Sequence, residues 1–415
     1  MQPPRFNICD YLGFLLVSYC VAPDEEVRIQ KRTSEGFEVD YQWTYINFTW
    51  DTPEDYKDAV LNKKYIPQNN AMGGVKFYND RVYIALPRLR TGTPVTLAYV
   101  TPQRNAKTNL LLTPYPSWNM NVQNSCGTLQ NVQSMEIDRR GIMWVLDGVR
   151  INTFTSCPPK LVLLDLNNNG KVLHSYSFHN EISMRQGGYL NDLVVEESGG
   201  GFAYITDSSA LDPGLVVYSR RQGRAWKLRD KTMFAEFDAA NFTVDGVSVV
   251  GFIGVDGIAL SPPPKHRDEE RLIYFTALNG YSIYALSNKI LKNEAYCKTD
   301  QWRRFVKYVG DKSSQSGGMI MDNKGNLFYG LLGTYSIAKW NIFEPFSTVK
   351  HIYHDEKQLI WPDSFGMDST GNLYVLTNGI IKFFDTSYPL TLNGKIKFRI
   401  LKTYTGNKNY MFSGK

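Results

Sequence analysis

A strand–turn–strand pattern returns six times along this chain of 415 residues. In its two clearest copies, 316–333 and 361–378, alternating apolar residues flank a polar turn, and both copies pass through Met-Asp-x-x-Gly-Asn-Leu-aromatic. Apolar residues with a period of two are typical of half-buried β-strands, and Gly, Asp and Asn supply the turn between two strands. The other four copies lie at 73–89, 132–148, 189–207 and 254–278.

A third apolar run follows each copy, so that each repeat offers at least three short strands, and the linking segments leave room for a fourth. These runs lie at 94–100, 160–166, 214–220, 281–287, 335–341 and 379–385. Four-stranded antiparallel units repeated around an axis form a β-propeller. Two packed β-sandwich domains are the alternative, because a chain of this length can hold two domains. The even spread of the repeats favours closure, so we predict an all-β, six-bladed propeller as a single domain over residues 37–412.

Composition and charge narrow the classes of protein and partner. The sequence is 43% hydrophobic and 21% charged, which supports a large core and argues against disorder. The net charge of +6 is mild, and the densest basic stretch, 219–231, carries no recognised nucleic-acid motif. We therefore expect no nucleic-acid partner and a monomeric protein.

The N-terminal region has the features of an export signal. An apolar run at 11–22 has the length of a signal-peptide core, follows Arg5, ends in small residues and is too short to span a bilayer. A buried first strand is the alternative. We expect residues 1–22 to be a signal peptide and residues 23–36 to be a flexible segment. We expect the mature protein to be secreted and extracellular, without association with a membrane.

Sequons and cysteines fit an exported protein. The triplets that begin at Asn47 and Asn241 are acceptors for N-glycosylation. After signal cleavage three cysteines remain, and Cys126 and Cys157 flank the first strands of the second repeat. We predict a disulfide between these two, which leaves Cys297 free. No spacing resembles a zinc site, and we expect neither a metal nor another cofactor.

Several motifs in one order resemble the yellow / major royal jelly protein family of insects. The matching stretches are Phe37–Trp50, Lys63–Val100, Tyr115–Asn121, Ile137–Val149, Ser156–Leu166, Gly214–Leu228, Gly257–Pro262 and Trp361–Asp368. The resemblance implies a six-bladed propeller, secretion, and roles in cuticle pigmentation, nutrition or small-amine binding. Some members of that family are associated with the conversion of dopachrome in melanin synthesis.

The cysteines depart from the pattern of this family. Arg139 and Arg140 occupy the region where many members have an Asp-x-Cys sequence, and Lys339 stands where many have the cysteine of Cys-Trp-Asn. The family's usual bridges are therefore in doubt here, and a bridge from Cys126 to Cys157 would compensate for them.

Acidic residues recur at the heads of the predicted innermost strands, which converge at one mouth of a propeller channel. Alignment of the repeats places Asp256 and Asp363 at the same position, Asp192 within one residue of it, and Gln133 in the second repeat. Three carboxylates around one cavity would favour a protonated amine or a metal ion, or would hold a proton for acid/base chemistry. Alternatively, each Asp satisfies N–H groups of a turn.

Polar and aromatic neighbours complete the predicted ligand site. Asn191 precedes Asp192, and the two with Asp256 and Asp363 are also compatible with the acidic, Asn-lined channel of calcium-dependent propeller hydrolases. Tyr189, Phe365 and Trp361 would stack on a ring-bearing ligand, although aromatic side chains more often serve the core. Neither a Gly-x-Ser-x-Gly motif nor a phosphate-binding P-loop occurs in the sequence.

Together these features predict a secreted propeller that binds a small aromatic amine or a catechol-derived metabolite in its central channel, with pigmentation and melanin biology as the setting that the resemblance implies. Two alternatives remain open. One is an isomerase that converts dopachrome through the channel carboxylates. The other is a structural or storage protein whose channel has no ligand chemistry.

Overall fold

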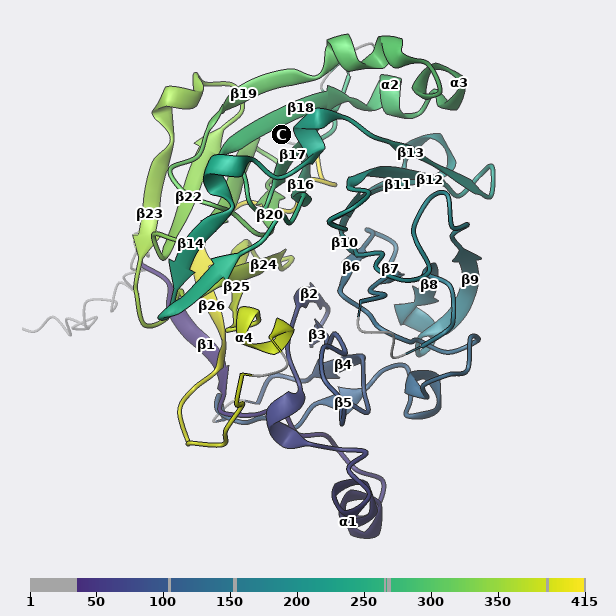
Figure 1. Cartoon of the computed structure of the whole chain (residues 1–415), viewed down its shortest axis with the longest axis vertical. Coiled ribbons are helices and arrows are strands. Elements are labelled where there is room, and N and C mark those ends of the chain that lie inside the picture. The colour runs from purple at the N-terminus through teal and green to yellow at the C-terminus, as the bar shows by residue number, and fades with distance from the viewer. Residues whose placement is uncertain are drawn as a thin grey trace, which may run out of the picture. The chain divides into compact units, whose positions relative to one another are not determined.

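Six four-stranded antiparallel sheets stand around a common axis, as the computed structural model shows (Figure 1). The predicted signal peptide lies outside the described residues, and the predicted flexible segment does so up to residue 35. The structure describes residues 36–103, 106–151, 155–264, 266, 270–385 and 388–413.

The blades follow one another in chain order, each running from its innermost to its outermost strand. Blade one contains β2 (Gly74–Tyr78), β3 (Arg81–Ala85), β4 (Leu97–Val100) and β5 (Thr113–Pro114). Blade two contains β6 (Ser134–Ile137), β7 (Ile142–Asp147), β8 (Lys160–Asp165) and β9 (Lys171–Ser177). Blade three contains β10 (Leu190–Glu196), β11 (Phe202–Asp207), β12 (Gly214–Ser219) and β13 (Arg224–Leu228).

The second half of the ring has the same organisation. Blade four contains β16 (Val255–Leu260), β17 (Leu272–Ala277), β18 (Ser282–Ser287) and β19 (Lys307–Asp311). Blade five contains β20 (Met319–Met321), β21 (Asn326–Leu331), β22 (Ser336–Asn341) and β23 (Lys350–His354). Blade six contains β24 (Pro362–Met367), β25 (Asn372–Thr377), β26 (Phe398–Tyr404) and β1 (Glu38–Trp43). The predicted all-β, six-bladed propeller is therefore confirmed.

The ring is closed within blade six. The innermost strands contact one another in sequence, and β24 of the last blade contacts β2 of the first. The outermost strand, β1, comes from the other end of the described chain and pairs antiparallel with β26, from Glu38 opposite Lys402 to Trp43 opposite Phe398. Hydrogen bonds between early and late segments thus hold the circle together.

The repeated Met-Asp-x-x-Gly sequence is a turn that joins the first two strands of a blade. In blade five the Asp322 carboxylate accepts hydrogen bonds from the backbone N–H groups of Lys324 and Asn326, at 2.8 and 2.9 Å. Asp368 makes the equivalent bonds in blade six. Gly325 follows with a φ of +78°, a conformation that favours glycine. The repeated sequence therefore reflects both this hydrogen-bonded turn and the alternation of the strands on either side of it.

The predicted third strand of blade six at 379–385 is wrong. This segment contains the short helix α4 (Ile381–Phe384), and β26 supplies the third strand instead. The apolar run lacks a strict period of two. Ile380 and Phe383, three residues apart, are buried in the core, and this spacing fits a helical turn and not the alternation of a strand.

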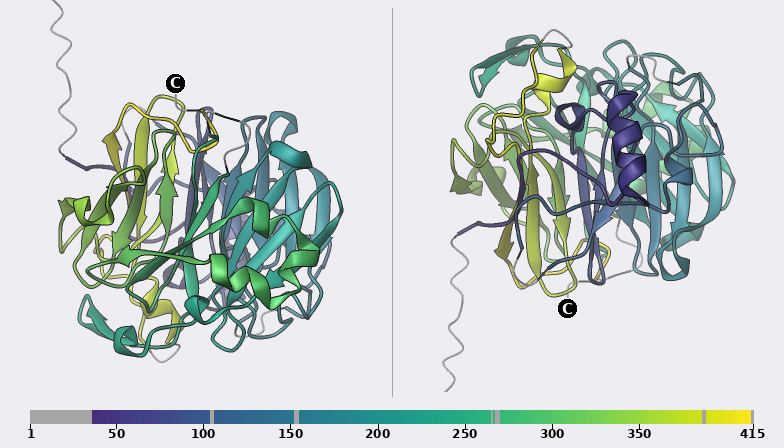
Figure 2. Two further views of the ribbon diagram at one scale, coloured as in Figure 1. Left: turned by 90° about the horizontal axis from the view of Figure 1, so that it is seen from above. Right: turned by 90° about the horizontal axis from the view of Figure 1, so that it is seen from below.

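Two further elements lie outside the four-stranded blades. The hairpin of β14 (Asn241–Val244) and β15 (Val247–Val250) is inserted between blades three and four, and α1 (Pro53–Leu61) lies on the outside of the ring (Figures 1 and 2). None of the helices in the described part of the chain is long and apolar enough to span a membrane.

The predicted disulfide between Cys126 and Cys157 is confirmed, and the Cys297 thiol is free and buried. Of the two sequon residues, Asn241 is exposed on the inserted hairpin, while Asn47 is half-buried. The Asn47 side-chain oxygen accepts a hydrogen bond from the backbone N–H of Phe48. Glycosylation at both positions stays a prediction.

Candidate functional site

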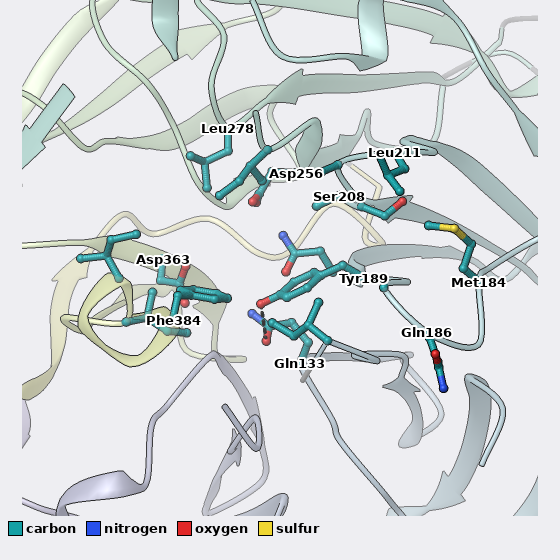
Figure 3. Close-up of a pocket in the computed structure, with 18 of the residues that line it drawn as sticks. Gln133, Met184, Gln186, Tyr189, Ser208, Leu211, Asp256, Leu278, Asp363 and Phe384 are labelled. Atoms are coloured by element: carbon teal, nitrogen blue, oxygen red, sulfur yellow. Dashed lines mark hydrogen bonds between the residues drawn. The ribbon is translucent and has the colours of Figure 1, made fainter. Parts of the chain in front are cut away.

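A cavity of about 400 Å³ lies where the heads of several innermost strands meet (Figure 3). Several of its polar side chains come from the starts of β6, β10, β16 and β24 or from the residues just before them. The remaining wall is mostly apolar and comes largely from connecting segments and α4. The lining residues are Gln133, Ile151, Met184, Gln186, Gly187, Tyr189, Asn191, Ser208, Ser209, Ala210, Leu211, Ile253, Asp256, Leu278, Trp361, Asp363, Ile380, Ile381 and Phe384.

The structure brings together most of the residues that were predicted to form the ligand site. Gln133, Tyr189, Asn191, Asp256 and Asp363 all line this cavity. Their part in binding a ligand stays a prediction, but their convergence is a property of the fold.

Irregular strand pairing explains why these positions face the cavity. The register between the first two strands shifts around Asp256 in blade four and around Asp363 in blade six. In blade three the corresponding shift spans Asn191 and Asp192. A bulge of this kind re-aims a side chain relative to the regular alternation of a strand. In blade three it is Asn191, and not its acidic neighbour, that lines the cavity.

Asp192 and Phe365 lie outside the cavity wall. The Asp192 carboxylate accepts hydrogen bonds from the Ser134 hydroxyl at 2.8 Å and from the Leu193 N–H at 2.9 Å. Burial raises its pKa, and the nearby charge of Lys76 opposes that rise. Phe365 packs in the core between blades five and six, and its carbonyl accepts a hydrogen bond from the Lys76 ammonium at 3.1 Å.

The Asp363 side chain is partly buried, and its carboxylate is hydrogen-bonded. It accepts hydrogen bonds from the Trp361 indole N–H at 3.2 Å and from the Asn378 amide at 2.9 Å. Burial raises the pKa of Asp363 to about 7, against the opposing effect of these two donors. This carboxyl therefore gains and loses its proton near neutral pH.

The pKa of Asp256 is shifted in the same direction as that of Asp363. Burial raises the pKa of Asp256 well above its usual range, and the charges of Asp363 and Asp192 raise it further. Lys312 and Asn191 oppose the shift. Burial and the neighbouring acids thus both disfavour full ionisation of the carboxyls that line the cavity.

Tyr189 places a neutral phenol in the middle of the site. Its hydroxyl donates a hydrogen bond to the Gln133 side-chain oxygen at 3.2 Å, as drawn in Figure 3. Burial raises the pKa of Tyr189 far above neutrality, with the charges of Asp363 and Asp256 adding to the shift. The ring centroids of Tyr189 and Phe384 are 6.3 Å apart, so aromatic surface lies on the same wall as the acids.

Several lining residues escaped sequence reasoning because they come from connecting segments. Met184, Leu211 and Phe384 add apolar surface, and Ser209 adds a buried hydroxyl that has no hydrogen-bond partner among the described residues. None belongs to the repeated strand pattern, and Phe384 fell in a segment that we assigned to a strand. Only the third apolar run of blade six signalled that the segment around Phe384 was buried.

Lys312 is a second group without a sequence signal. It lies directly after β19, and its ammonium donates a hydrogen bond to the Thr276 hydroxyl. Burial lowers the pKa of Lys312 to about 7, while the charges of Glu236 and Asp256 act in the opposite direction. Its positive charge therefore acts on the acidic side of the cavity from behind the wall.

A smaller cavity of about 310 Å³ is lined by Lys76 and Glu136. Lys76 and Glu136, from the innermost strands of blades one and two, form an ion pair at 3.3 Å. The Tyr410 hydroxyl accepts a hydrogen bond from the Val195 N–H at 2.8 Å. Within the described residues no group of three or more His, Cys, Asp or Glu is placed to hold a metal ion.

Solved structures with a similar arrangement of strands include enzymes of unrelated sequence. A luciferin-regenerating enzyme aligns with a TM-score of 0.47 and 12% identity over 83% of this chain and 94% of its own. Virginiamycin B lyase from Staphylococcus aureus aligns with a TM-score of 0.41 and 12% identity over 74% of this chain and 78% of its own. At these values the similarity says nothing about chemistry.

Curated relatives are similar over most of the chain. A dopaminechrome tautomerase of Drosophila melanogaster is 25% identical over 393 residues, which cover 89% of this chain and 82% of the relative. Protein yellow of Drosophila yakuba is 26% identical over 351 residues, which cover 81% of this chain and 64% of that protein. The sequence profile described as major royal jelly protein matches residues 130–409. The chain therefore belongs to the yellow / major royal jelly protein family.

Proposed function

We propose that this protein binds a small aromatic amine or a catechol-derived metabolite in the channel cavity. The observation that carries the proposal is that Asp256, which is buried, and Asp363, which is partly buried, line a cavity of about 400 Å³ together with a largely apolar and aromatic wall. Small-molecule sites commonly combine apolar walls with a few convergent polar groups.

Each half of such a ligand has a counterpart in the cavity. A planar ring would pack against Phe384, Tyr189 and Trp361, which line one continuous surface. A protonated amine would donate charge-assisted hydrogen bonds to the Asp363 carboxylate. Ring hydroxyl groups would find a partner in the Ser209 hydroxyl, which has none among the described residues.

Catalysis of a tautomerisation is the second candidate, and the pKa of about 7 at Asp363 favours it. A carboxyl poised near neutral pH can accept a proton from one atom of a substrate and return it to another. A tautomerisation needs only such a proton transfer. The similarity to a dopaminechrome tautomerase gives the same direction, although at 25% identity it does not fix the substrate.

We also propose that the protein is secreted and acts in pigmentation and melanin biology. The apolar run at 11–22 supports export, and similarity to protein yellow supports this setting. N-terminal sequencing of the secreted protein should find a start close to Val21 or Pro23. An intracellular product that retains Met1 would contradict export.

Calorimetry and a turnover assay on the same preparation test the two candidates. Serotonin, dopamine and octopamine are titrated into the purified protein, and the loss of dopachrome and dopaminechrome is followed by absorbance. Binding without turnover supports a carrier, and turnover supports a tautomerase. If neither occurs, the proposal is wrong and the channel is incidental to a structural or storage role.

The pH dependence of amine binding identifies the responsible carboxyl. Because Asp363 ionises near pH 7, amine affinity should rise between about pH 5.5 and about pH 8.5, where the amine itself stays largely protonated. In Asp363→Asn this rise should vanish, and affinity above neutrality should fall about tenfold to a hundredfold. The same pH profile in both proteins would remove Asp363 from the binding site.

A further inference from the structure

A second concave surface lies between the segment before β24 and the segment that joins α4 to β26. It encloses about 810 Å³ and shares no lining residue with the channel cavity. Its lining includes five cationic side chains, those of Lys357, Lys382, Lys395, Lys397 and Arg399. Only Asp245 and Glu356 are acidic among the residues that line it, so the basic cleft, as we call this surface, carries an excess of positive charge.

The acidic groups near the cleft are largely occupied. Asp245, at the tip of the inserted hairpin, forms an ion pair with Lys382 of α4. Asp355, behind the cleft, accepts hydrogen bonds from the backbone N–H groups of Lys357 and Gln358 and from the Gln358 amide. Glu356 is exposed and makes no hydrogen bond or ion pair among the described residues, so its charge remains, and the five cations of the lining still outnumber its two acids.

The Arg399 guanidinium is the most informative of these groups. It is half-buried, yet it makes no hydrogen bond or close ion pair with any described residue, and only the charge of Asp355 supports it from a longer distance. A guanidinium has five N–H donors, and leaving them unsatisfied while partly removed from water is unfavourable. The side chains of Lys357 and Lys395 also lack a direct partner within the described part of the chain.

The cations lie close enough to affect one another. Burial lowers the pKa of Lys397, and the charge of Lys382 lowers it further. Burial also lowers the pKa of Arg399. Both shifts mean that the cleft disfavours the protonated forms of Lys397 and Arg399. A bound anion would favour those charged forms and so raise both pKa values again.

We propose that the basic cleft binds an anion that carries several phosphate or sulfate ester groups. Arginine and lysine together suit such groups, because the planar guanidinium matches two oxygens at once and the ammonium supplies a mobile point charge. The cleft extends well beyond one ion, and Ile360, Phe383 and Leu390 add apolar wall for the body of a larger molecule. This site does not depend on what the channel binds.

Two small polyanions distinguish the sources of the ester group. The full chain is titrated with myo-inositol hexakisphosphate and with sucrose octasulfate at about 0.15 M salt, where weak surface attraction is screened. We expect at least one to bind at a single site, and the tighter of the two identifies phosphate or sulfate as the preferred ester. Failure of both to bind would overturn the proposal.

A double variant locates the site. Lys395→Gln with Lys397→Gln removes two cations of the cleft, and the affinity should fall at least tenfold, because charge-assisted hydrogen bonds are lost. Arg399→Gln should have a similar effect, and all variants should bind with a weaker dependence on salt. If the double variant does not fold, Lys357→Gln changes only an exposed side chain and should still weaken binding measurably.

The matched control is Lys171→Gln with Lys231→Gln, which makes the same change in net charge at exposed positions on β9 and on the short 3₁₀ helix Lys231–Met233. The control should bind both polyanions within about twofold of the unmodified chain, close to measurement error in free energy. An equal loss in the control and in the cleft variant would show attraction by net charge alone, and the cleft would then not be the site.

Discussion

The protein shifts the pKa values of two aspartates of blade six, Asp363 and Asp368, in opposite directions. Asp363 heads an innermost strand, and burial raises its pKa to about 7. Asp368 lies five residues later in the turn, where burial acts to raise its pKa but hydrogen bonds from Asn372, Thr370 and Tyr374 lower it. The sequence pattern around each is similar, so the difference arises from what surrounds the side chain and not from the residue type.

The two residues therefore make opposite predictions for stability. Because the pKa of Asp363 is higher in the folded than in the unfolded state, its ionisation destabilises the fold as the pH rises from about 4 to about 7. Asp363→Asn should make the fall of the free energy of unfolding across that window less steep, while the raised pKa values of Asp256 and Asp192 keep part of it. Urea unfolding at several pH values measures this, and an unchanged slope would contradict the burial of the charge.

Asp368→Asn is the matched comparison. A lowered pKa contributes stability above the unfolded value of about 3.8 and loses it only as the pH falls further, so between about pH 5 and about pH 8 the substitution should leave the slope unchanged. It should lower the free energy of unfolding at every pH in that range by about 1–3 kcal/mol, because turn N–H groups lose an ionised acceptor.

For single residues, the sequence predicted which positions lie near the cavity better than it predicted which side chains point into it. The repeat alignment selected Asp256 and Asp363 because their spacing from the turn is shared. It could not predict that Asp192 would face Ser134, because one residue of bulge exchanges the side chains that two neighbouring positions present to the channel. Ser209 belongs to no repeat, and Phe384 fell in an apolar run that the repeats assigned to a strand, so periodicity did not place either side chain in the cavity.

Among the elements, the disulfide of blade two offers a direct test. It joins Cys126 to Cys157 and closes a loop with a sequence separation of 31. In the chain-entropy account such a closure restricts the unfolded chain, and its removal in Cys126→Ser with Cys157→Ser should cost about 3–4 kcal/mol. Urea unfolding measures the loss, and the native protein should expose no more than the one thiol of Cys297 on peptide mapping. Three alkylatable thiols would contradict the bridge.

Strands were predictable where their apolar residues alternate and a turn sequence follows. The error at α4 shows the limit of that signal, because a short apolar run fits a buried strand or a helical turn equally well. The inserted hairpin of β14 and β15 was missed for a different reason. It pairs only with itself and belongs to no blade, so it has no counterpart in the repeats.

For the whole molecule, closure through β1 predicts that the blades unfold together. Trp43 of β1 is fully buried, and its indole donates a hydrogen bond to the Leu110 carbonyl at 2.9 Å, beyond its own blade. Trp43→Ala should cost about 3–5 kcal/mol and shift a single transition. Unfolding followed by fluorescence and by far-UV circular dichroism should give coincident curves. A separate early transition for blade six would contradict this coupling.

The closing pair of β1 and β26 also has a consequence in time. A ribosome makes β1 among the first described residues and its partner roughly 350 residues later, which at usual rates takes on the order of tens of seconds. Until then β1 lacks the strand with which it pairs, and the blades already made form an open ring. The nascent chain should therefore need chaperones longest at its N-terminal part, which contains β1. A polypeptide whose synthesis stops before Phe398 should stay sensitive to proteases along its whole length.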